Sequence, residues 1–403
     1  MPFTTHLESA IDGTRLDCQT LQTLHQGRPL WVRYDLPAVA VAMSKQIVAL
    51  REPTLWRYRE LLPVAAGEEV TFGEGMSPLL ACPVLGKRLG VADLWIKDES
   101  QLPGGSFKSR GMAMAVSMAK KFGVNRVALP TAGNAGGAAA MYAARAGMEC
   151  YVFMPRDTPV VNQYEASLFG AKAYLIDGLI NDCGKVVRDG AAAMNWFDLS
   201  TLKEPYRIEG KKTMGLELAE QFDWQLPDVI LYPTGGGTGL IGMWKAFQEL
   251  RDIGWLNSEK MPKMVSVQSD GCCPIVRAFD KGERFAGPFA NAATIASGLR
   301  VPVAVGDFMI LDAIRESGGT AVAVPEASIR SLCELACRTE GISVCPEAAT
   351  CVGALQQLLA NGFVKPHQRV VIFNTGAAQK YVEAIHCELP TLDISQPIDW
   401  TTL

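Results

Sequence analysis

Residues 126–154 have the sequence RVALPTAGNAGGAAAMYAARAGMECYVFM, and this stretch predicts the fold class of the chain. An apolar run over 126–130 predicts a strand, and after a glycine-rich turn an alanine-rich segment over 137–147 predicts a helix. A second apolar run over 150–154 predicts another strand. Two short strands joined by a helix indicate a βαβ unit, in which the strands are parallel.

The same alternation continues on both sides of this unit. It predicts helices over 110–122, 181–195, 211–222, 239–251 and 377–386, and strands over 172–176, 228–232, 264–268 and 369–373. Strands that alternate with helices favour largely parallel sheets with helices on both faces. We therefore expect a doubly wound α/β architecture.

The length of 403 residues exceeds what one hydrophobic core usually serves, so we expect two lobes. Residues 198–210, DLSTLKEPYRIEG, lack helical or strand periodicity and predict a crossing between the lobes. We expect a small domain over 108–200 and a large domain formed by 51–107 and 201–403. Residues 1–50 form an N-terminal extension in this division.

Composition argues against several classes of protein. The formal net charge is −4, and Lys and Arg do not cluster among aromatic residues, so nucleic acid is not expected as a partner. No apolar run approaches the length that spans a bilayer, and the first residues lack the pattern of a signal peptide. We therefore expect a cytoplasmic protein without membrane association. The eleven cysteines have no regular spacing, which favours reduced thiols.

The segment PGGSFKSRG, residues 103–111, places Lys108 between a glycine turn and the start of an expected helix. The positive end of a helix disfavours an ammonium group and so lowers the pKa of a lysine there. A lysine with a lowered pKa is a good nucleophile for forming a Schiff base. For an isolated lysine, the alternative interpretation is a solvated side chain at the helix start. The other motifs of the sequence decide between the two interpretations.

Residues 234–239, TGGGTG, follow one expected strand and open the next expected helix. Backbone N–H groups that no side chain obstructs then meet the positive end of a helix, and this arrangement is typical of a phosphate-binding loop. The glycine spacing differs from that of dinucleotide-binding loops and of Walker loops. A tight turn without a ligand is the alternative.

Two more loops end strands of the expected sheets. In PTAGNAGG, residues 130–137, Asn134 can donate a hydrogen bond to a ring oxygen, although a helix-capping turn would also have this composition. Thr375 follows the last expected strand, and its hydroxyl can bond a pyridine nitrogen. Parallel strands bring their carboxyl ends to one edge, so the loops are expected to meet.

These motifs, in this order, resemble the fold-type II pyridoxal-phosphate (PLP) enzymes, which have the tryptophan-synthase-β-like fold, and within them the threonine synthases. The resemblance extends over most of the chain. Its further segments are GRPL (27–30), VRYDL (32–36), LWRYRELLP (55–63), GEGMSPL (73–79), KDE (97–99) and PYRIEGKKT (205–213). The last is similar to the family's NPxRLEGQKT.

The resemblance implies a PLP cofactor, a small amino-acid substrate and a homodimer. It implies that Lys108 forms the Schiff base and acts as the proton-transfer base. The cofactor-binding residues that it implies are Lys108, Asn134, Gly235, Gly236, Gly237, Thr238 and Thr375. The implied substrate-binding residues are Thr131, Ala132, Gly133, Ala135 and Arg207, with Lys212 as a further candidate.

The implied reaction converts O-phospho-L-homoserine into L-threonine and phosphate. Ala135 and Gly136 lack the hydroxyl groups that the family uses for its substrate, and Glu204 would repel a nearby phosphate. These departures favour an alternative, a serine/threonine dehydratase-like lyase or another β-eliminating or β-replacing PLP lyase that acts on a non-phosphorylated amino acid. A non-catalytic binding protein is disfavoured because the lysine, the asparagine, the glycine loop and the threonine are all present.

Two positions carry further expectations. Arg300 lies in a segment similar to one that lines the family's cofactor pocket, so it faces either the substrate or a structural acid. The family's Cys-x-x-Cys pair in the N-terminal extension is retained only at Cys18, with Leu21 in the second place. We therefore expect no structural zinc and no other metal site.

Overall fold

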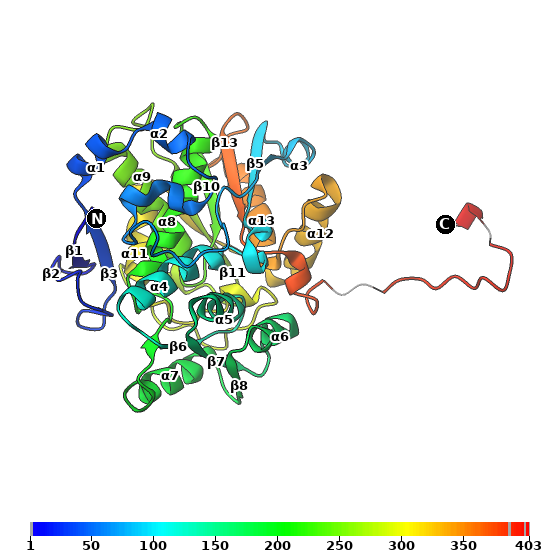
Figure 1. Ribbon diagram of the computed structural model, residues 1–403. Helices are drawn as coiled ribbons and strands as arrows, with labels where there is room; N and C mark the ends of the chain where they lie inside the picture. The colour runs from blue at the N-terminus through cyan, green and yellow to red at the C-terminus, as the bar shows by residue number, and fades with distance from the viewer. Residues whose placement is uncertain (1–2, 386–387, 399, 403) are drawn as a thin grey trace.

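Two open sheets carry the fold in the computed structural model, which describes residues 3–385, 388–398 and 400–402 (Figure 1). The larger sheet has the order β12-β11-β10-β13-β5-β4 and the smaller one β8-β7-β6-β9. The larger sheet consists of β4 (Leu79–Ala81), β5 (Asp93–Asp98), β10 (Val229–Pro233), β11 (Lys263–Ser269), β12 (Thr320–Val324) and β13 (Arg369–Asn374). Its neighbours are parallel except for β4, which runs antiparallel to β5.

The smaller sheet is parallel throughout. It consists of β6 (Arg126–Pro130), β7 (Glu149–Pro155), β8 (Lys172–Ile176) and β9 (Phe197–Asp198). Its accompanying helices are α5 (Ala135–Ala146), α6 (Val160–Leu168) and α7 (Ile180–Met194). The expected α/β architecture with largely parallel sheets is confirmed. The division of the chain at residues 50, 107 and 200 stays a prediction.

The strands of the larger sheet are apolar because helices cover both of its faces. Val229 and Leu231 of β10 belong to one buried cluster, whereas Ile230 and Tyr232 of the same strand belong to another. Alternate side chains of a strand point to opposite faces, so both faces are buried. The covering helices are α3 (Pro83–Leu89), α8 (Tyr206–Gln221), α9 (Thr238–Asp252), α10 (Pro274–Asp280), α11 (Asp307–Glu316), α12 (Ile329–Glu340) and α13 (Pro346–Ala360).

The N-terminal residues form an antiparallel sheet of β1 (Thr4–Ser9), β2 (Arg15–Leu16) and β3 (Leu30–Tyr34), followed by α1 (Leu36–Ala42) and α2 (Lys45–Ala49). The Tyr34 hydroxyl donates to Glu209 Oε2 at 2.8 Å, and Lys245 Nζ donates to the Val32 carbonyl at 2.7 Å. Buried polar bonds therefore tie this extension to α8 and α9. In the ranges that the structure describes, no three His, Cys, Asp or Glu side chains group as metal ligands.

Two expected elements are wrong. Residues 206–210 are helical, because α8 begins at Tyr206 and not at 211. Glu204 Oε2 accepts the backbone N–H groups of Tyr206 and Arg207, at 2.7 and 3.0 Å, and so satisfies donors at the helix start.

The second wrong element is the helix expected over 377–386. The described part of this stretch contains only a 3-10 turn over Ala378–Lys380. Lys380 is buried, and its Nζ donates to the Gly104 carbonyl at 2.8 Å and pairs with Glu165 at 2.5 Å. Tyr381 is also drawn inward, so tertiary bonds override the helical pattern.

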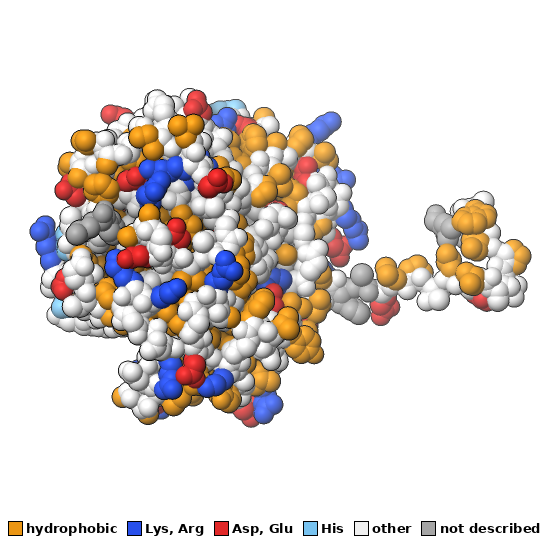
Figure 2. Space-filling view, in the orientation of Figure 1, with side chains coloured by type: hydrophobic (Ala, Val, Ile, Leu, Met, Phe, Trp, Pro, Cys, Tyr) orange, Lys and Arg blue, Asp and Glu red, His pale blue; other side chains and the backbone are white. Residues whose placement is uncertain are grey.

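The molecular surface mixes charges of both signs. On the face shown in Figure 2, Lys and Arg side chains are interspersed with Asp and Glu side chains. Residues 388–398 lead away from the body of the molecule (Figure 1). Within the described ranges, no helix is both long and apolar enough to cross a bilayer.

A close helix contact positions the start of α4 (Lys108–Lys121), the helix that carries the expected cofactor lysine. A Cβ atom on Gly210 of α8 would lie 2.0 Å from the Arg110 carbonyl oxygen. Arg110 itself is fully buried and pairs with Glu99 and Glu217, in each case at 2.5 Å. The backbones of α4 and α8 can approach this closely only because residue 210 has no side chain.

Gly210→Ala is therefore expected to destabilise the protein by about 1–3 kcal/mol, because the added methyl group forces the two helices apart. Chemical denaturation followed by tryptophan fluorescence measures this change. Gly287→Ala is the matched control, since a Cβ atom there meets nothing within 4 Å. Equal midpoints for the two variants would contradict the proposed role of the contact.

Candidate active site

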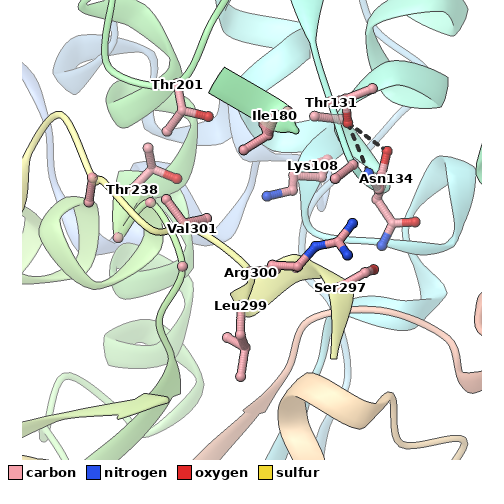
Figure 3. Close-up of a pocket in the computed structure, with 18 of the residues that line it drawn as sticks. Lys108, Thr131, Asn134, Ile180, Thr201, Thr238, Ser297, Leu299, Arg300 and Val301 are labelled. Atoms are coloured by element: carbon pink, nitrogen blue, oxygen red, sulfur yellow. Dashed lines mark hydrogen bonds between the residues drawn. The ribbon is translucent and has the colours of Figure 1, made fainter. Parts of the chain in front are cut away.

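A cavity of about 410 Å³ lies where the carboxyl ends of β6, β10 and β13 meet the start of α4. Figure 3 shows Lys108 between Thr201 and Thr238 on one side and Thr131 and Asn134 on the other. The expected site residues that line the cavity are Lys108, Thr131, Ala132, Gly133, Asn134, Ala135, Gly235, Gly236, Gly237, Thr238 and Thr375. Segments far apart in the sequence are thus brought together at one edge of the two sheets.

Lys108 is the first residue of α4, and its side chain reaches into the cavity. Burial, and to a lesser extent the nearby charge of Arg207, lower the pKa of its amine to about 7, whereas Glu347 acts in the opposite direction. A large fraction of this amine is therefore uncharged at neutral pH. The direction of the shift agrees with the expectation from the helix start, but desolvation is its main cause.

The glycine loop is closely packed on all sides. A Cβ atom on Gly235 would lie 2.2 Å from the Gly298 carbonyl oxygen, and one on Gly236 would lie 2.7 Å from Thr201 Cγ2. Gly237 precedes α9 with a φ of 77°, in the left-handed region that favours glycine. The loop therefore requires glycine, and it exposes backbone N–H groups at the start of a helix, where phosphate binds well.

Asn134 precedes α5 and is held by a residue that the sequence did not indicate. Its Nδ2 donates to the Tyr381 hydroxyl at 3.0 Å. An amide nitrogen has two N–H groups, so one remains for a ligand in the cavity. In the same loop, Thr131 Oγ1 donates to the Gly133 carbonyl at 2.8 Å and accepts its N–H at 3.1 Å (Figure 3).

Thr375 follows β13, and its hydroxyl lies 3.6 Å from Cys345 Sγ. On the same side of the cavity, the Glu347 carboxylate accepts the Gly298 N–H at 2.7 Å. Burial raises the pKa of Glu347. The Thr375 hydroxyl is uncharged and can be the partner of a pyridine nitrogen.

Arg207 and Lys212 lie away from the cavity surface. Arg207 is buried, and its Nη1 donates to the Leu199 carbonyl at 2.8 Å. Its effect on Lys108 is through its charge, and it is absent from the cavity lining in the described part of the chain. Lys212 is fully buried and pairs with Glu209 at 2.6 Å and Glu249 at 2.9 Å, so it serves the packing of α8 on α9.

Arg300 bridges the two sides of the cavity. Its Nη1 and Nη2 atoms donate to the Asp157 carboxylate at 2.6 and 2.8 Å. Asp157 follows β7 of the smaller sheet, whereas Arg300 comes from the side of the larger one. Of the two expectations for Arg300, the structural acid is therefore present.

Other lining residues were not foreseen. They include Ile180, Asn181, Gly184 and Arg188 of α7, with Ser200, Glu347 and Tyr381. Most lie in segments without a glycine-rich motif, so no local sequence pattern indicated that they line a site. Tyr381 fell within the wrongly expected helix.

These residues fit the PLP group that the resemblance implies. A Cβ atom on any residue of 235–237 would collide with a neighbour, so the loop has no side chains there and its backbone lines the cavity, where its N–H groups can bind a phosphate. The free N–H of Asn134, the Thr375 hydroxyl and the uncharged amine of Lys108 face the same cavity. They offer a donor for the ring oxygen, a partner for the ring nitrogen and a nucleophile for the aldehyde.

Comparison with known proteins decides the family. A family model described as "Pyridoxal-phosphate dependent enzyme" matches residues 70–376. The chain belongs to this family. It is 34% identical to the threonine synthase of Methanocaldococcus jannaschii over 368 residues, which cover 91% of this chain and 90% of that protein. It is 36% identical to the threonine synthase of Methanosarcina acetivorans, over 90% of this chain and 88% of that protein.

Solved structures show the same fold at lower identity. Diaminopropionate ammonia lyase from Escherichia coli superposes with a TM-score of 0.66 at 21% identity, covering 78% of this chain and 88% of that one. Maize serine racemase gives a TM-score of 0.65 at 20% identity, covering 75% of this chain and 88% of that one. The resemblance to threonine-synthase-like PLP enzymes is confirmed, and the family's PLP dependence establishes the cofactor.

The lowered pKa of Lys108 has a measurable consequence. In the protein without cofactor, modification of Lys108 by an amine-selective reagent should rise with pH through a midpoint of about 7, because only the neutral amine reacts. Peptide mapping by mass spectrometry measures the modified fraction at each pH. A lysine in a model peptide has its midpoint at about 10.4, and the same value for Lys108 would contradict this description.

Proposed function

We propose that this PLP-dependent lyase is a threonine synthase of amino-acid biosynthesis, which converts O-phospho-L-homoserine into L-threonine and phosphate. The observation that carries the proposal is a cavity lined by Lys108, Asn134, the 235–238 loop and Thr375 together with an excess of cationic side chains. The relatives that are threonine synthases support it over about nine-tenths of the chain.

In this proposal, each cofactor contact has one task. Backbone N–H groups of Gly235, Gly236, Gly237 and Thr238 bind the cofactor phosphate, and Asn134 donates to the ring oxygen. Thr375 partners the ring nitrogen with a hydroxyl, which leaves the ring less charged than a carboxylate would. Bound PLP withdraws electrons from the bonds at the substrate Cα.

Lys108 carries the proton transfers as well as the Schiff base. A pKa of about 7 allows its amine to accept the Cα proton and to return a proton later at the same pH. Arg207 contributes by its charge, which helps to keep this amine neutral. Arg207 stays a candidate for the substrate's phosphate through its charge, because it is buried and absent from the described cavity lining.

The loop at the start of α5 is our candidate for the substrate carboxylate. Thr131, Ala132, Gly133 and Ala135 line the cavity beside Lys108, and the first turn of α5 presents backbone N–H groups there. A Cβ atom on Gly136 would lie 2.6 Å from Thr131 Cγ2. Packing against Thr131 thus explains why residue 136 is a glycine. The glycine is therefore not evidence that the site has lost recognition of a phosphorylated substrate.

The charges of the cavity favour a substrate with a second anionic group. Its cationic lining residues are Arg188, Lys203 and Arg300, which pair with Asp189, Asp198 and Asp157, and its one carboxylate among the lining residues described is Glu347. The expected repulsion from Glu204 is reduced, because this carboxylate caps α8 and burial raises its pKa to about 7. A phosphorylated amino acid matches this balance better than serine or threonine does.

The alternative is a dehydratase-like lyase on a non-phosphorylated amino acid. The absence of a hydroxyl at Ala135 favours it, since that side chain lines the cavity. Solved threonine deaminases share the fold, for instance that of Solanum lycopersicum with a TM-score of 0.62 at 20% identity. At this identity, the likeness concerns the fold alone.

We further propose that the protein is a homodimer in the cytoplasm. The homodimer is what its resemblance implies. The ten cysteines within the described ranges are all free thiols, which fits a reducing compartment.

Parallel assays with O-phosphohomoserine, threonine and serine test the two functions. We expect release of inorganic phosphate with threonine from the first compound, and no 2-oxo acid from the other two. The Lys108→Ala variant is the control and should lose both the visible cofactor band and phosphate release. Formation of 2-oxo acid without phosphate would establish the alternative, and no phosphate at high enzyme concentration would refute the proposal.

Lys203→Met should raise the KM for O-phosphohomoserine by about tenfold or more, because a charged hydrogen bond to phosphate is lost. The value of kcat should change much less, since Lys203 lies away from Lys108 on the wall formed by residues 200–203. Lys281→Met, an exposed position outside the cavity lining, is the matched control. An unchanged KM in the Lys203 variant would remove this residue from the substrate site.

A further inference from the structure

Lys211 differs from the other buried lysines of the molecule. It is fully buried in α8, one turn beyond Arg207. Lys97, Lys212 and Lys245 each pair with a carboxylate, at 3.1, 2.6 and 2.5 Å. In the described ranges, no carboxylate lies within ion-pairing distance of Lys211, whose Nζ instead donates to the Phe107 carbonyl.

A buried amine without a counter-ion is most stable in its neutral form, because transfer of an ammonium group from water into the interior is costly. The groups around Lys211 add to this effect. Burial lowers its pKa well below the usual value, and the charges of Lys108, Arg207 and Arg110 lower it further, while Glu99 opposes them. Burial without a counter-ion therefore favours the neutral form of Lys211, which still donates a hydrogen bond.

The acceptor of this bond belongs to the peptide unit that precedes Lys108. Phe107 is held on both sides, since its N–H donates to the Thr375 carbonyl at 3.1 Å and its carbonyl accepts from Lys211. The Nζ atoms of Lys108 and Lys211 lie 4.3 and 4.0 Å from the centroid of the same Phe107 ring. The bond therefore fixes the lysine turn relative to β13 and α8.

The lysine segment also makes room for the Lys211 side chain. A Cβ atom on Gly111 would lie 3.1 Å from Lys211 Cε. Gly111 thus leaves the space through which the aliphatic part of Lys211 reaches Phe107. Gly111 of α4 and Lys211 of α8 therefore pack directly against each other.

We propose that Lys211 is a positioning residue that acts as a neutral donor to the Phe107 carbonyl and thereby holds Lys108 in place for capture of the cofactor. The proposal rests on the proposed role of Lys108 as the cofactor lysine. It is independent of the substrate. It differs from a role as a counter-ion, which would require Lys211 to be charged, and from mere filling of space.

Three variants separate these roles. Lys211→Gln keeps a donor without a charge, Lys211→Met keeps the volume without a donor, and Lys211→Arg introduces a permanent charge. The first readout is the rate at which protein freed of cofactor captures PLP, followed by the visible band. We expect Met to slow capture about tenfold and Gln to stay within about threefold of the original protein.

The second readout is the pH midpoint for modification of Lys108 in the protein without cofactor. A neutral Lys211 predicts the same midpoint in the original protein and in the Gln and Met variants, and a lower one in the Arg variant. A higher midpoint in both Gln and Met would show that Lys211 is charged and overturn the proposal. Equal capture rates for Gln and Met would overturn the donor role.

Two controls keep the outcomes distinct. Thermal unfolding of each variant without cofactor identifies a loss of fold, and only variants that unfold cooperatively are compared. If Lys108→Ala still acquires the cofactor band, the role of Lys108 fails, and the proposal for Lys211 fails with it. If phosphate is not released from O-phosphohomoserine, the substrate is wrong, but both readouts for Lys211 keep their meaning.

Discussion

The buried guanidinium of Arg110 is the constraint on which the active site depends. It lies two residues after Lys108 and pairs with Glu99 after β5 and with Glu217 of α8. A buried ion pair contributes little net stability, because desolvation offsets the attraction, but a lost partner leaves an uncompensated charge. The network therefore selects one arrangement of the larger sheet, α4 and α8. Because the pairs of Arg110 fix the start of α4, they also fix the position of Lys108.

The same low-polarity interior sets the chemistry of the cavity. Burial lowers the pKa of Lys108 and raises that of Glu347, so both groups are shifted toward their neutral forms. A charged group placed in such surroundings is stabilised only by a partner of opposite sign. The cationic side chains on the walls pair with carboxylates of the chain, and the anionic groups of the cofactor and of a phosphorylated substrate would compete with these partners. The burial of the site by the fold thus affects which substrate charge the cavity favours.

Much of the site could be predicted from the sequence because its parts are local. A glycine run at a strand-to-helix junction is visible in the sequence alone, and the 235–238 loop lies where it was expected. Contacts from distant segments could not be predicted in this way, as Tyr381 and the Asp157 partner of Arg300 show. The start of α8 was missed because Glu204, an acidic residue in an irregular stretch, acts as a cap through its side chain. The prediction of a helix after Thr375 was wrong because Lys380 pairs with Glu165 of α6 and Tyr381 accepts a hydrogen bond from Asn134 before α5.

The bridge between Arg300 and Asp157 has a consequence for ligand selection. Arg300 is 17% exposed at the cavity, and its carboxylate partner on the other lobe is 60% exposed. An incoming anion that approaches Arg300 must compete with Asp157 for the same two N–H groups. The binding free energy of such an anion is then the difference between its own ion pair with Arg300 and the Arg300–Asp157 pair that it replaces. A weakly binding anion therefore gains little at Arg300, whereas an anion that binds the guanidinium more strongly than Asp157 would replace the ion pair across the cavity.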